Sequence, residues 1–131
     1  SEDLHSIGQF IQQGSPILFE TFVTVRARDA SVVLPATDKK DYFDYLTGRD
    51  FWDINDTARR ATMRAHSEGG IPCLELSIPA IDAHTLGELF YFFLFSCYLS
   101  CRLVGVNPFN QPGVESYKGY MFKNLGKPGA K

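Results

Sequence analysis

The sequence predicts an α/β fold in which helices alternate with short strands. Apolar residues recur at helical spacing in several segments, whereas residues 17–25 and 71–78 are short runs rich in apolar and β-branched residues, as in strands. Such alternation is typical of helices packed on a mostly parallel sheet. We therefore expect a layered α-β-α sandwich.

The first part of the chain is predicted to contain two helices and two strands. Apolar residues within 4–13 have helical spacing, and Gly14 supplies a C-terminal stop. The run 17–25 is almost continuously apolar or β-branched, which predicts an inner strand covered on both faces. Residues 32–34 form an edge strand at best, because a proline closes the run. A short amphipathic helix is expected over residues 37–48.

The following segments are predicted in the same way. Residues 50–66 carry apolar residues at helical spacing with arginines on the opposite side, and two glycines end this helix. Residues 71–78 alternate apolar and polar side chains and predict a second strand. Pro112 suits a first helical turn, so a helix is expected from there to about residue 125, with a frayed tail over residues 127–131.

A long apolar helix is expected from Asp82 to about Val104. Asp82 and the capping-box pair Thr85 and Glu88 mark its beginning. The stretch 86–106 is long enough for a bilayer core. Polar and charged residues interrupt it, and basic flanks are lacking, so burial in a larger protein body is the favoured interpretation and no membrane partner is expected.

Composition limits the classes of protein to which the chain can belong. Its 131 residues, 44% of them hydrophobic, are enough for one compact domain with an apolar core. The net charge of −2 offers no basic surface for nucleic acid or anionic lipid. Three cysteines without metal-ligand spacing fit a reducing cytoplasm, and no signal-peptide pattern opens the chain. The abrupt start, helical in pattern within a few residues, indicates a piece of something longer.

The most informative segment for function is residues 107–118. Gln111 precedes the last predicted helix, where free N–H groups and the positive end of the helix dipole favour an anionic or polyhydroxylated ligand. Lys118 lies two turns further along, so an amide and an ammonium group can face one groove. The alternative from the residues alone is that Gln111 caps the helix and Lys118 is a solvated surface lysine.

The same segment resembles the C-terminal signature of glucose-6-phosphate isomerases, Phe-(Asp or Asn)-Gln-x-Gly-Val-Glu-x-x-Lys, which residues 109–118 match at every fixed position. Asn110 stands where aspartate is commoner. Residues 3–14 resemble the family segment that bears a catalytic histidine, a position that His5 fills, and residues 66–72 are similar to a segment leading into a strand. The resemblance covers essentially the whole chain and is closest to the bacterial members.

The resemblance implies a cytoplasmic enzyme that interconverts glucose 6-phosphate and fructose 6-phosphate without a cofactor. It implies a sugar-isomerase-type (SIS) domain over residues 1–131, with the N-terminal domain absent. His5 and Lys118 then correspond to the family's ring-opening residues, with the histidine supplied by the neighbouring subunit of a homodimer, and Gln111 corresponds to a substrate-contacting glutamine. Proton transfer at a ring oxygen suits such groups near neutral pH.

Two features implied for the family are missing from the sequence: the glutamate that moves a proton through the enediolate, and the Ser/Thr-rich loops that hold the phosphate. The chain alone is therefore expected to be inactive. The alternative is a stand-alone regulatory module that binds sugar phosphates. The three histidines, His5, His66 and His84, match no zinc pattern, so no metal is expected.

Overall fold

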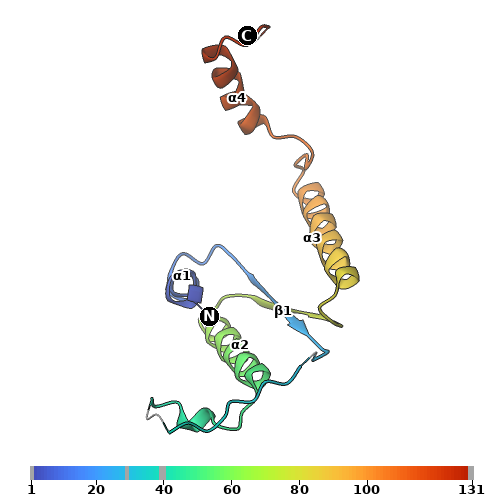
Figure 1. Cartoon of the computed structure of the whole chain (residues 1–131). Helices are drawn as coiled ribbons and strands as arrows, with labels where there is room; N and C mark the ends of the chain where they lie inside the picture. The colour runs from blue at the N-terminus through green and yellow to red at the C-terminus, as the bar shows by residue number, and fades with distance from the viewer. Residues whose placement is uncertain (1, 29, 39–40, 130–131) are drawn as a thin grey trace. The chain divides into compact units, whose positions relative to one another are not determined.

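The computed structural model describes residues 2–28, 30–38 and 41–129 and confirms the α/β class. In chain order the elements are the 3-10 helix η1 (Glu2–His5), α1 (Ile7–Gln13), β1 (Glu20–Val25), the 3-10 helix η2 (Asp44–Leu46), α2 (Phe51–Glu68), β2 (Cys73–Ile78), α3 (Ala83–Leu103) and α4 (Pro112–Asn124) (Figure 1). The backbone divides into two compact units, residues 1–85 and 86–131. Each unit is described by itself below.

The first unit is built around a parallel pair of strands joined through α2. Register pairs Glu20 with Cys73 at one end and Val25 with Ile78 at the other. The expected parallel pairing is confirmed, but within the described residues the sheet has two strands, so β1 is not an inner strand of this chain. The residues predicted to begin it lie outside the ladder, and Ile17 is 82% exposed. In the described part of the chain, no further strand covers this apolar run.

The segment between β1 and α2 differs most from expectation. Residues 32–34 contribute an isolated antiparallel bridge, Val33 with Asp50, rather than a strand. The amphipathic helix predicted for residues 37–48 is wrong, apart from residues 39–40, which lie outside the described part. Tyr42 has a φ of 66°, a left-handed conformation that a right-handed helix cannot contain. The main chain is helical in this segment for one 3-10 turn, η2.

The centre of the first unit lies where α2 ends and β2 begins. Gly70 has a φ of 91°, and the Ile71 N–H donates to the His66 carbonyl over 3.0 Å, so the helix closes as a Schellman motif. This turn brings Ile71, which is 5% exposed, next to His66, also 5% exposed. Ile71 is the single buried apolar side chain among the described residues. The larger apolar core expected from composition is therefore not formed among the described residues.

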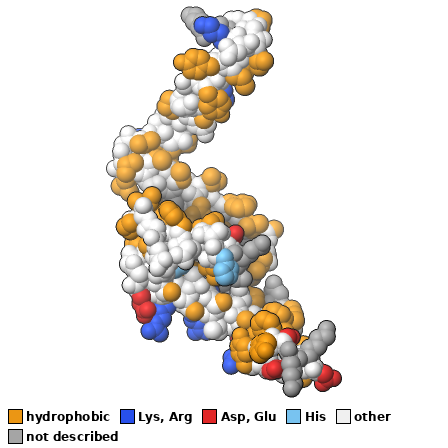
Figure 2. Space-filling model, turned by 90° about the vertical axis from the view of Figure 1, so that its left-hand side faces the viewer, with side chains coloured by type: hydrophobic (Ala, Val, Ile, Leu, Met, Phe, Trp, Pro, Cys, Tyr) orange, Lys and Arg blue, Asp and Glu red, His pale blue; other side chains and the backbone are white. Residues whose placement is uncertain are grey.

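Helix α3 begins within one residue of the prediction, and Asp82 caps its first turn. The Asp82 carboxylate accepts a hydrogen bond from the Thr85 N–H at 2.8 Å, and this bond lowers the pKa of Asp82. Thr85 lies inside the helix and is therefore not an N-cap. Many apolar side chains of α3 are exposed, Phe90 by 61% and Leu94 by 72%, and Figure 2 shows such side chains on the surface that it draws. Among the described helices, α3 alone has the length and apolar composition of a membrane span.

Helix α4 begins at Pro112 and ends at Asn124, within one residue of the prediction. Residues 127–129 lie outside any helix or strand, as the predicted tail requires, and residues 130–131 lie outside the described part. Helices α2 and α3 likewise match their predicted ranges within about two residues. The fixed caps at Asp50, Asp82 and Pro112 explain this agreement, because each satisfies or removes a free N–H group at a helix start.

Candidate functional site

His5 is the last residue of η1 and is exposed. The turn that follows it is closed by the Ser6 N–H, which donates to the Asp3 carbonyl over 3.2 Å, and the Phe10 N–H donates to the Ser6 carbonyl as α1 begins. The imidazole therefore stands at a sharp junction between two short helices. The position of the imidazole therefore depends on how this junction packs against the other elements of the first unit.

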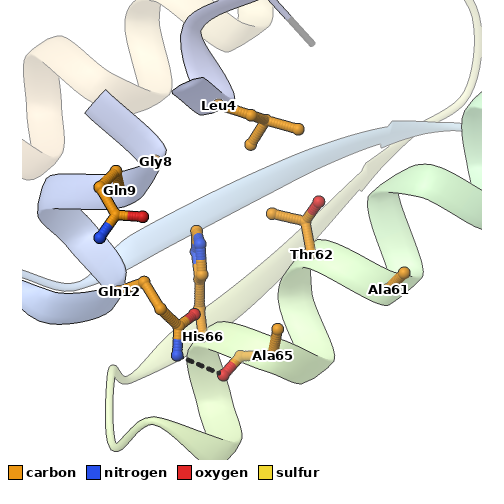
Figure 3. Close-up of a pocket in the computed structure, with 8 residues that line it drawn as sticks. All are labelled: Leu4, Gly8, Gln9, Gln12, Ala61, Thr62, Ala65 and His66. Carbon is orange, nitrogen blue, oxygen red and sulfur yellow. Dashed lines mark hydrogen bonds between the residues drawn. The ribbon is translucent and has the colours of Figure 1, made fainter. Parts of the chain in front are cut away.

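A cavity of about 350 Å³ lies where that junction meets α2 (Figure 3). It is lined by Leu4, Gly8, Gln9 and Gln12 on one side and by Ala61, Thr62, Ala65 and His66 on the other. The Gln12 side-chain amide donates to the Ala65 carbonyl over 3.1 Å and joins the two helices. Figure 3 shows the His66 side chain pointing from α2 toward the junction.

A half-buried carboxylate holds His66. Its Nδ1 lies 2.5 Å from Oε2 of Glu20, a residue on β1 whose side chain is 18% exposed. Burial, reinforced by the charge of Glu20, raises the pKa of the Cys73 thiol, whose sulfur lies 3.9 Å from the same carboxylate oxygen. The sheet register explains the grouping, because Glu20 and Cys73 are partners across the two strands.

The second unit holds the other two predicted site residues. Gln111 occupies the N-cap position of α4, as the capping alternative required, but its side chain makes no cap hydrogen bond. Lys118 Nζ lies 3.0 Å from Glu115 Oε1, and the lysine side chain is 40% exposed. Lys118 is thus an ion-paired lysine on α4, with Glu115 one turn before it.

The structure therefore brings Lys118 next to Glu115 on α4, the helix that Gln111 precedes, while His5 belongs to the first unit. The buried pair of His66 and Glu20 was not predicted from the sequence as a site. The two residues are 46 positions apart, and only the packing of α2 on β1 joins them. Among residues 2–28, 30–38 and 41–129, no three His, Cys, Asp or Glu side chains are grouped so as to hold a metal ion.

Comparison with known proteins gives strong sequence matches, although no family model matches the chain. It is 50% identical over 128 residues to glucose-6-phosphate isomerase of Leptospira biflexa, and 44% identical over 128 residues to that of Staphylococcus aureus strain Newman. Each match covers 97% of this chain. The chain is homologous to a stretch of glucose-6-phosphate isomerase. The resemblance predicted from residues 3–14 and 107–118 is thereby confirmed.

The chain spans 28 to 29% of the length of these glucose-6-phosphate isomerases. A structural match agrees with the fold: the crystal structure of a hypothetical protein from Thermus thermophilus superposes with a TM-score of 0.85 at 26% identity. That superposition covers 95% of this chain and 30% of the other. Both comparisons thus relate this chain to a part of a longer protein.

Proposed function

We propose that this chain is the C-terminal part of a glucose-6-phosphate isomerase, an aldose-ketose isomerase of glycolysis and gluconeogenesis. The observation that carries the proposal is the 50% identity to the Leptospira biflexa enzyme across 97% of the chain. The substrates are glucose 6-phosphate and fructose 6-phosphate. The enzyme is cytoplasmic and needs no cofactor, metal, nucleic acid or membrane.

In this proposal the chain contributes the groups that open the sugar ring. Opening requires a proton at the ring oxygen and removal of one from the anomeric hydroxyl. An imidazole can both donate and accept a proton, and the imidazole of His5 is exposed. Lys118 supplies a positive charge and a donor, and its pairing with Glu115 at 3.0 Å holds the ammonium group beside α4. His5 acts in the neighbouring subunit of a homodimer.

Gln111 is proposed to contact the substrate. Its side chain is exposed and is not used to cap α4, so the amide can donate and accept hydrogen bonds with a sugar hydroxyl. The first N–H groups of α4 and the positive end of its dipole add to the attraction for a phosphorylated sugar. Direct contact by Gln111 and charge from Lys118 would thus recognise different parts of the same molecule.

The base that moves the proton between C1 and C2 is proposed to come from outside this chain. Four of its glutamates are already engaged within the described structure: Glu20 with His66, Glu68 with Arg64, Glu75 with Arg59 and Glu115 with Lys118. These contacts occupy the four carboxylates with partners inside the chain. The isolated chain is therefore expected to bind weakly or not at all and to lack turnover.

The test is a full-length enzyme in which this chain replaces the matching stretch of the Leptospira biflexa isomerase. We expect conversion of fructose 6-phosphate by this chimera, and none by the chain alone. His5→Ala and Lys118→Ala should each lower kcat on closed-ring substrate by about 100-fold or more, within the range that general acid-base groups supply. Gln111→Ala should raise KM.

Wild-type rates in both the His5→Ala and the Lys118→Ala chimera would refute the proposed roles. Turnover by the purified chain alone would refute the proposal that the base for isomerisation comes from outside this chain. Tight binding of glucose 6-phosphate to the chain alone by calorimetry, with no rescue of activity in the chimera, would instead support the stand-alone sugar-phosphate-binding module.

A further inference from the structure

His66, which pairs with the half-buried Glu20, is buried in a unit that otherwise buries little. Gly8, His66, Ile71 and Thr85 are the buried residues of the described part of the chain. A polar ring in such a place costs free energy unless its hydrogen bonds are satisfied. Glu20 meets that requirement at Nδ1, over 2.5 Å, and so fixes the orientation of the ring.

The cavities beside the His66 ring are also lined by residues on both sides of His5 in the sequence. Leu4 and Gly8 are one helical turn apart, and both line two cavities together with His66, one of about 350 Å³ and one of about 190 Å³. Gly8 is the one buried residue of α1. A Cβ at Gly8 would stand 3.1 Å from Leu4 Cδ2, so the turn is already tight. His5 lies between them in sequence and is exposed, so the turn that carries His5 borders the same cavities as the His66 ring.

These cavities themselves are poor candidates for a ligand site. In the larger cavity three polar side chains are bonded within the protein: the Gln12 amide to the Ala65 carbonyl, the Thr62 hydroxyl to the Ala58 carbonyl, and the Gln9 amide to the side chain of Gln13. A ligand would have to break those bonds. The arrangement instead serves to hold α1 against α2.

We propose that His66, held by Glu20, is a positioning residue for His5 in opening the sugar ring. The inference rests on the catalytic role proposed above for His5. Neither member of the pair needs to touch the substrate. Glu20 accepts the Nδ1 proton of His66, the ring supports Leu4 and Gly8, and the exposed imidazole between them keeps its orientation. Misplacement of a catalytic group by about 1 Å costs up to about 100-fold in rate.

The test uses the full-length chimera with Glu20→Leu, which leaves the His66 ring without its partner. We expect kcat on closed-ring fructose 6-phosphate to fall about tenfold, with KM unchanged. Conversion of an open-chain analogue that cannot cyclise should be unaffected, because it bypasses ring opening. A purely structural defect would lower both rates together, since it would reduce the fraction of folded enzyme.

Four further variants complete the design. Glu20→Gln keeps an acceptor oxygen and should restore the closed-ring rate to within about threefold of wild type. Glu68→Leu is the matched control, because it removes an exposed carboxylate from the same helix as His66 and should leave both rates unchanged. If Glu20→Leu does not fold, His66→Asn retains a donor near the Nδ1 position and should give a smaller closed-ring loss than His66→Leu.

His5→Ala in the same chimera separates the two proposals. If His5→Ala lowers the closed-ring rate while Glu20→Leu and His66→Leu do not, the positioning role is overturned and the role of His5 stands. If His5→Ala has no effect, the proposed function of His5 fails. Equal losses on the closed-ring and open-chain substrates in Glu20→Leu also overturn the positioning role.

Discussion

Truncation of Ile71 to alanine tests whether the first unit really depends on the small cluster at the end of α2. Ile71 is 5% exposed, and its N–H closes the helix on the His66 carbonyl. The substitution removes three carbon groups, worth about 2.4 kcal/mol at about 0.8 kcal/mol each, before any cavity is counted. A unit of this size with few buried residues has a free energy of unfolding of about 4 kcal/mol. Ile71→Ala should therefore remove more than half of it.

Urea unfolding followed by tryptophan fluorescence measures this loss, because the chain has one tryptophan, Trp52, in the first turn of α2. The urea concentration at the unfolding midpoint should fall by about 1.5 M, given the dependence of the unfolding free energy on urea concentration that is typical of a small domain. Ile17→Ala is the matched control, since Ile17 is 82% exposed and the same truncation there should change stability by about 0.5 kcal/mol or less. Equal midpoints for the two variants would refute the placement of the core at Ile71.

Three other outcomes follow from the structure. The hydrogen bond from Thr85 lowers the pKa of Asp82 below its usual 3.8. The cap of α3 should therefore be intact above pH 3.8 and be lost as the pH falls through the lowered pKa. Faster amide exchange in the first turn of α3 would report this loss. Burial raises the pKa of the Cys73 thiol, so iodoacetamide at pH 8 should modify it more slowly than exposed Cys97, as mass spectrometry of peptides will report. The exposed apolar surface of α3, which includes Leu94, is expected to make the chain self-associate. Leu94→Glu should therefore weaken concentration-dependent self-association in sedimentation experiments. An unchanged association constant would contradict this role of the α3 surface.

The helices could be predicted because their signals are local. Asp50 and Pro112 mark starts, Gly70 marks an end, and the apolar spacing between such signals needs no tertiary information. The parallel pairing of the strands followed from their alternation with α2. The signature residues His5, Gln111 and Lys118 could be located for the same reason, since each stands in a short contiguous motif.

The incorrect predictions concern segments whose conformation depends on tertiary contacts. Residues 37–48 carry aromatic and charged residues in a pattern that also fits a helix, but Tyr42 takes a left-handed conformation, and one 3-10 turn remains. Residues 17–25 have the composition of a covered strand, yet their first residues have no neighbouring strand within the described chain. Both predictions assumed partners that sequence periodicity cannot supply.

His66 shows the limit most clearly, because its type and its position on α2 favour an ordinary packed histidine. Its partner Glu20 begins a strand that precedes it by 46 residues, and neither residue stands in a motif. The proposed role follows only once the sheet register pairs Glu20 with Cys73 and the fold brings His66 to a cavity that Leu4 and Gly8 also line. A half-buried carboxylate bonded to a buried imidazole favours one ring orientation, because rotation would leave the buried Nδ1 without its partner. That constraint is what an exposed histidine on the overlying turn needs if it is to meet a substrate in a fixed geometry.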